Sequence, residues 1–109
     1  FSQYDDWYFG STHGPGEYGK FEFDEVGIWD KALSQAEITT IYNSGNSLNL
    51  SSNTGSYDSS GNLKGYWNFN EGSGSAINDL SGNGNNGTLH NGVNWILIYY
   101  VRVYCSKDA

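Results

Sequence analysis

The chain has 109 residues and a formal charge of −7, is 17% aromatic, and contains fifteen glycines and one cysteine. A chain of this length holds at most one small hydrophobic core, and it has no Lys/Arg cluster of the kind that binds nucleic acid. Its longest apolar run, 95–101, is far shorter than the roughly 20 residues of a membrane-spanning helix, so neither nucleic acid nor membrane insertion is expected.

Two strands around a glycine-containing loop are predicted near the start of the chain. Residues 7–10 and 21–30 are rich in aromatic and β-branched side chains, whereas 11–19 has the glycine and proline content of a loop. The alternation of the second strand slips at Asp24 and Glu25, which indicates a bulge.

A short helix is predicted near 34–43. Ser34 stands three residues before Glu37, the capping-box spacing in which each side chain binds the other residue's backbone N–H. Three apolar residues follow with the spacing of one helical face: Ile38, Ile41 and Tyr42. We expect this face to pack on a sheet.

The second half of the chain is predicted to be strands and turns. Residues 46–62 are dominated by Ser, Asn and Gly, which indicates a linker or a long surface crossing at a module boundary. The expected elements after it are a strand at 63–70, a return at 75–80, a Gly/Asn loop at 81–87, and short strands at 88–90 and 93–95. The tail, 96–109, is strongly β-prone and contains Cys105, which has no cysteine partner within the chain.

Two runs carry a family resemblance. Phe23-Asp-Glu-Val-Gly-Ile-Trp29 with its following helix resembles the closing strand and helix of laminin-G-like domains, in the concanavalin A-like lectin and glucanase group. Leu63-Lys-Gly-Tyr-Trp-Asn-Phe-Asn-Glu-Gly-Ser-Gly74, with the Asn/Gly loop after it, resembles the opening of such domains. The resemblance implies an all-β jelly-roll sandwich with one short helix.

The order of these two runs is the reverse of that in a complete domain. Two explanations stay open: a fragment spanning the junction of tandem repeats, or a unit whose opening strand follows its closing helix. The first and last strands of such jelly rolls tend to be neighbours in a sheet, so the two runs can still pair, which gives the permuted order a physical route. The expected organisation is a closing portion at 1–45, a linker or crossing at 46–62, an opening portion at 63–95 and an atypical tail at 96–109.

The function that this resemblance implies is non-enzymatic carbohydrate binding or adhesion, in a larger extracellular or cell- or virion-surface protein. The expected partners are glycans, neighbouring repeats and, through open strand edges, a strand-swapped dimer. No targeting segment is visible in the chain. One alternative is a structural spacer without a ligand. The other is a glucanase-like hydrolase, for which Glu22 and Asp24 share a strand face but have no further acid at the expected offset.

The candidate sites are a glycan surface and a calcium loop, and no catalytic residue is assigned. Aromatic rings and amides suit sugars, and the glycan candidates are Trp7, Tyr18, His13, Asn85 and Asn86. Calcium, the one cofactor considered, favours carboxylate and amide oxygens, and its candidate ligands are Asp79, Asn83 and Asp24. The alternatives are a purely structural turn at that loop and an acidic balance that serves only solubility.

Overall fold

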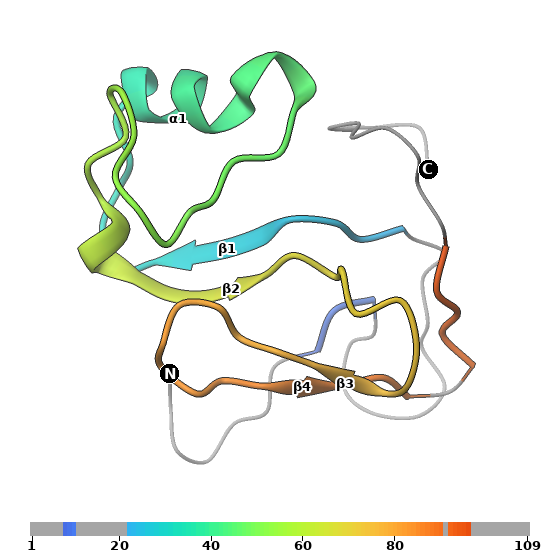
Figure 1. Ribbon diagram of the computed structural model, residues 1–109. Helices are drawn as coiled ribbons and strands as arrows, with labels where there is room; N and C mark the ends of the chain where they lie inside the picture. Colours follow the sequence, from blue (N-terminus) through green and yellow to red (C-terminus); the bar gives the residue numbers. More distant parts are fainter. Residues whose placement is uncertain (1–7, 11–21, 91, 97–109) are drawn as a thin grey trace.

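The computed structural model describes residues 8–10, 22–90 and 92–96, which form two small antiparallel sheets and one short helix (Figure 1). The elements are β1 (Val26–Trp29), α1 (Gln35–Tyr42), β2 (Leu63–Trp67), β3 (Ala76–Ile77) and β4 (Gly87–Thr88). In Figure 1 β1 and β2 run side by side, with α1 beyond β1 and the β3–β4 pair beyond β2. No helix in the described ranges has the length and apolarity needed to cross a membrane.

The two runs that resemble the ends of a laminin-G-like domain pair with each other. In β1 and β2, Val26 lies opposite Trp67 and Ile28 lies opposite Gly65, and the register shifts before Trp29. This antiparallel pairing joins residues 34 to 41 positions apart in the sequence. Four short strands do not by themselves make a jelly-roll sandwich, so that fold stays a prediction.

Helix α1 begins as predicted. The Glu37 N–H donates to Ser34 Oγ at 3.1 Å, and the Ser34 N–H donates to Glu37 Oε1 at 3.2 Å, which completes the capping box. The helix ends at Asn43, whose φ of 48° is the left-handed conformation typical of this position.

The expected packing of all three apolar residues of α1 is wrong for two of them. Ile41 packs against the core, but Ile38 and Tyr42 are 50% and 54% exposed. The reason is the inward orientation of Glu37, which is only 3% exposed. Because residues four apart share a helical face, Glu37 brings Ile41 inward and turns Ile38 away.

The core lies between α1 and the β1–β2 pair. Its members are Leu50, Tyr57, Leu63 and Tyr66, with Trp29 and Ile41 packed against them. Leu50 and Tyr57 belong to the Ser/Asn/Gly-rich segment 46–62, and Tyr57 is fully buried. The segment therefore contributes two side chains to the same core as Leu63 and Tyr66.

Several predicted strands are shorter than expected or lack strand structure. The strand expected at 21–30 is regular only over β1, because Glu25 has a φ of 54° and interrupts the extended backbone just before it. Residues 8–10 and 93–95 form no strand. The predicted loop at 11–19, the tail from 97 onward and Cys105 lie outside the described residues.

Candidate functional site

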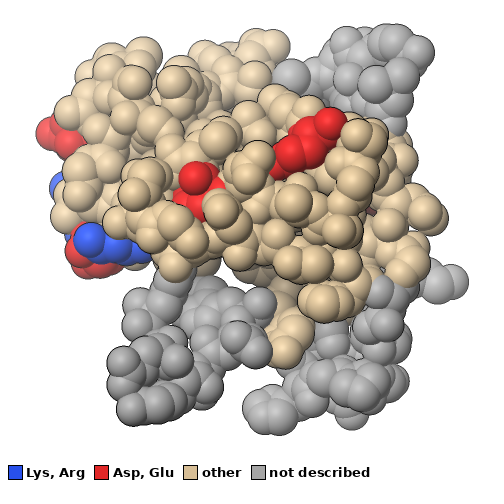
Figure 2. All heavy atoms as spheres, turned by 60° about the horizontal axis from the view of Figure 1, so that its bottom comes forward, with Lys and Arg blue, Asp and Glu red and all other residues tan. Residues whose placement is uncertain are grey.

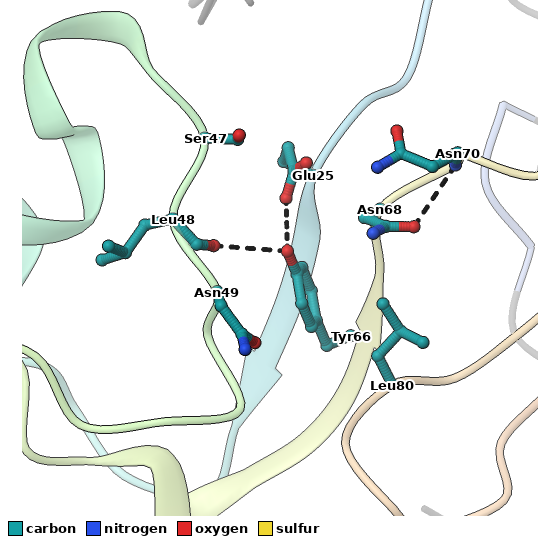
Figure 3. A pocket seen from close by; sticks show the side chains of 8 residues that line it. All are labelled: Glu25, Ser47, Leu48, Asn49, Tyr66, Asn68, Asn70 and Leu80. Atoms are coloured by element: carbon teal, nitrogen blue, oxygen red, sulfur yellow. Dashed lines mark hydrogen bonds between the residues drawn. The ribbon is translucent and has the colours of Figure 1, made fainter.

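An open pocket lies where the start of β1 meets the end of β2 (Figure 3). Its volume is about 280 Å³. Most of its lining side chains are polar, namely a carboxylate, two hydroxyls and three amides, and the full set is Glu25, Ser47, Leu48, Asn49, Tyr66, Asn68, Asn70 and Leu80. Because these residues come from four separate stretches of the sequence, only the folded chain brings them together.

Tyr66 and Glu25 hold each other at the centre of the pocket. The Tyr66 hydroxyl donates to Glu25 Oε2 at 2.5 Å and lies 3.3 Å from the backbone oxygen of Leu48 (Figure 3). Tyr66 is 3% exposed, and its burial together with the neighbouring carboxylate raises the pKa of its hydroxyl. The hydroxyl is therefore a fixed donor across the range of ordinary pH.

The carboxyl group of Glu25 is kept in an environment unfavourable to its charge. Burial raises the pKa of Glu25, the adjacent Asp24 raises it further, and the hydrogen bond from Tyr66 offsets only part of this effect. Burial also raises the pKa of Asp24. The positive φ of Glu25 is uncommon for a residue with a side chain, and such strain tends to occur at functional sites.

Two asparagines at the pocket wall are oriented by nearby backbone. Asn49 Oδ1 accepts a hydrogen bond from the Ser51 N–H at 3.0 Å, and Asn68 Oδ1 accepts one from the Asn70 N–H at 3.3 Å. Within the described part of the chain their amide NH₂ groups have no partner. These groups are therefore free to donate to a bound molecule.

The Gly/Asn loop between β3 and β4, which holds the calcium candidates Asp79 and Asn83 and the sugar candidates Asn85 and Asn86, is hydrogen-bonded to β2. Asp79 Oδ1 accepts from the Tyr66 N–H at 2.9 Å, and the amides of Asn83 and Asn85 donate to the backbone oxygens of Leu63 and Lys64 at 2.9 and 2.8 Å. Side chains of this loop thus satisfy backbone groups of β2 that β1 does not reach.

Asp79 also holds its own loop closed. Besides the Tyr66 N–H, its carboxylate accepts from the Ser81 and Asn85 N–H groups, both at 2.9 Å. Burial raises the pKa of Asp79, but the hydrogen bonds from Ser81, Tyr66 and Asn85 outweigh burial, so the pKa is lowered. Both carboxylate oxygens are thereby engaged with N–H donors.

The structure does not gather the predicted site residues at one place. Asn86 binds the Asp79 N–H at 2.9 Å and belongs with Asn83 and Asn85 to the loop, whereas Asp24 precedes β1, the strand that pairs with the other edge of β2. Over 8–10, 22–90 and 92–96, no three Asp, Glu, His or Cys residues form a group suited to a metal. The glycan candidates Trp7, His13 and Tyr18 lie outside the described residues.

Sequence reasoning assigned none of the pocket residues to a site. The signal for Glu25 was the slip in strand alternation, which corresponds to its positive φ. No local pattern marks Asn49, Asn68 or Asn70, because asparagines in a Gly/Ser-rich chain are ordinarily turn residues.

Comparison with protein-family models, with curated proteins and with solved structures found no match. The residues and geometry of the chain are therefore the basis for a functional proposal.

Proposed function

We propose that this chain is a carbohydrate-binding module of a larger extracellular or surface-displayed protein, built on a laminin-G-like jelly roll, and that the pocket around Glu25 and Tyr66 is its sugar site. The observation that carries the proposal is the pocket lining: one carboxylate, two hydroxyls and three amides around an open depression. A sugar presents hydroxyl groups that both donate and accept, so a rim of this mixed kind suits it.

The size and openness of the site fit a single sugar unit of a longer chain. The volume of about 280 Å³ lies just below the range of about 300–1,000 Å³ for drug-sized ligands, and the opening leaves the rest of a polysaccharide outside. Leu80 supplies apolar surface for the C–H face of a sugar ring. The NH₂ groups of Asn49 and Asn68 supply hydrogen-bond donors. Because their side chains are already oriented by backbone hydrogen bonds, less conformational entropy is lost when a sugar binds.

Two rival functions predict different outcomes. A glycoside hydrolase needs a pair of carboxyl groups on opposite sides of the scissile bond, whereas the described lining offers only Glu25. A spacer repeat would need no oriented donors in a pocket.

The test is binding of the purified chain to a panel of immobilised polysaccharides, followed by titration of soluble oligosaccharides. We expect saturable binding that Asn68→Ala weakens about fivefold, the loss of one hydrogen bond. The matched control is Asn78→Ala, an exposed asparagine outside the pocket. Absence of binding to every glycan would favour the spacer, and release of reducing ends would favour the hydrolase.

A further inference from the structure

We propose that the sugar bound in this pocket carries a free, protonated amino group, and that the Glu25 carboxylate receives it. This inference rests on the proposed function and adds the substrate class: cationic amino sugars, in preference to neutral, N-acetylated or acidic ones.

The first support is the unused acceptor capacity of Glu25. Its Oε2 accepts from Tyr66, but in the described residues its Oε1 has no hydrogen-bond partner. The backbone oxygen of Leu48 receives only the long 3.3 Å contact from the Tyr66 hydroxyl. An ammonium group has three N–H donors and no acceptor, so it fits a corner of the pocket made of a carboxylate and a carbonyl (Figure 3).

The second support is the absence of a cation to neutralise Glu25 within the described part of the chain. The two lysines there are both engaged elsewhere: Lys64 with Asp30 at 3.2 Å and Lys31 with Glu37 at 4.0 Å. Asp30 follows β1 and Glu25 precedes it, so the Lys64–Asp30 pair is at the opposite end of the strand from the pocket. In the view of Figure 2 the basic atoms lie at the left edge, whereas acidic groups lie both at that edge and across the middle of the surface.

The third support is electrostatic. The charged form of Glu25 is destabilised because its carboxylate is half-buried beside that of Asp24. A bound ammonium group would offset this penalty and form a charge-assisted hydrogen bond with Glu25. A uronic acid or a sulfated sugar would instead place a third negative charge beside Glu25 and Asp24. An N-acetylated sugar would keep its hydroxyl contacts but lose the ion pair.

The experiment titrates the chain with three oligosaccharides of equal length: β-1,4-linked glucosamine, its fully N-acetylated form and an oligogalacturonate. We expect the amino form to bind at least about tenfold more tightly than the acetylated form, and the galacturonate to show the weakest binding. Glu25→Gln keeps an acceptor for the Tyr66 hydroxyl and should abolish the preference. Glu22→Gln changes the net charge equally at an exposed position and should retain it.

The wild-type chain supplies a second readout that does not depend on a variant. Affinity for the amino form should fall as pH rises and the amine loses its proton, while affinity for the acetylated form stays constant over that range. Equal binding of the two forms, or an equal loss in the two glutamine variants, would overturn the inference and leave carbohydrate binding standing. Failure of all three sugars and of the polysaccharide panel would overturn the proposed function itself.

Discussion

The indole Nε1 of Trp29 donates a hydrogen bond to the Tyr57 hydroxyl at 3.0 Å, and the same hydroxyl donates to the backbone oxygen of Leu50 at 2.9 Å. The two rings meet edge to face, with centroids 6.3 Å apart. One buried hydroxyl thus ties β1 to the crossing segment that follows α1.

Replacing Tyr57 with Phe should therefore destabilise the fold. The change leaves the Trp29 N–H and the Leu50 oxygen without their partner, at a cost of about 1–3 kcal/mol in the free energy of unfolding. Urea denaturation measures this difference. Tyr42→Phe is the control, because Tyr42 is 54% exposed, and an equal effect of the two changes would contradict the role assigned to Tyr57.

Gly65→Ala should also destabilise the fold, through a direct clash. The Trp67 ring lies over Gly65, so a Cβ at position 65 would stand 2.3 Å from its Cη2 atom. Relieving this overlap means moving the ring from its site, at a cost of about 1–3 kcal/mol. A thermal melt measures this cost, and Gly61→Ala, which has no heavy atom within 4 Å of its new Cβ, should be nearly neutral in it. A neutral Gly65→Ala would show that the indole is free to move.

Glu37 should make the chain sensitive to acid. The hydrogen bond from Ser59 lowers the pKa of Glu37 to about 2, against the opposing effect of burial and with help from the Ser34 and Asp58 N–H groups and from Lys31. Since the folded pKa lies below the unfolded value of 4.5, the stability from Glu37 is complete above that pH and is lost as pH falls towards 2. In the Glu37→Gln variant, the denaturation midpoint should therefore fall less steeply than in the wild type as the pH is lowered from 4.5 towards 2.

Glu25 should affect the pH dependence of stability in the opposite direction to Glu37, so Glu25→Gln serves as the comparison for Glu37→Gln. The folded pKa of Glu25 is raised, so its favourable contribution is present at low pH and disappears as pH rises through that value. The substitution should therefore leave the acid-induced loss in place and help the chain at neutral pH. An unchanged acid profile in Glu37→Gln would show that other carboxyl groups dominate.

Calcium should leave the melting temperature unchanged if the Asp79 loop is structural as described. Both Asp79 oxygens face backbone N–H groups, which a cation would have to displace. Asp79→Asn places an amide N–H against one of these donors and should cost about 1–3 kcal/mol with or without calcium. A thermal melt in EDTA and then in excess calcium checks this, and an increase of several degrees with calcium would establish a metal site.

The helix and its start were predictable because they depend on residues within one turn of one another. Ser34 and Glu37 form the capping box wherever the segment lies. The pairing of β1 with β2 was predictable only through the family resemblance, since nothing within either run specifies its neighbour. The burial of Tyr57 in a Ser/Asn/Gly-rich segment was not predictable from composition.

The sequence by itself determined the short capped helix, two aromatic strands and an acidic, turn-rich chain, because these follow from local propensity and from charge. Only the tertiary structure decided what the polar side chains do. Asp79, Asn83 and Asn85 look like ligands in the sequence, but they bind backbone groups of β2 that lie 13 to 21 positions away. Glu25 and Tyr66 meet across 41 positions. A carboxylate or an amide takes whichever partner folding places within reach, so its role is a property of the packed chain.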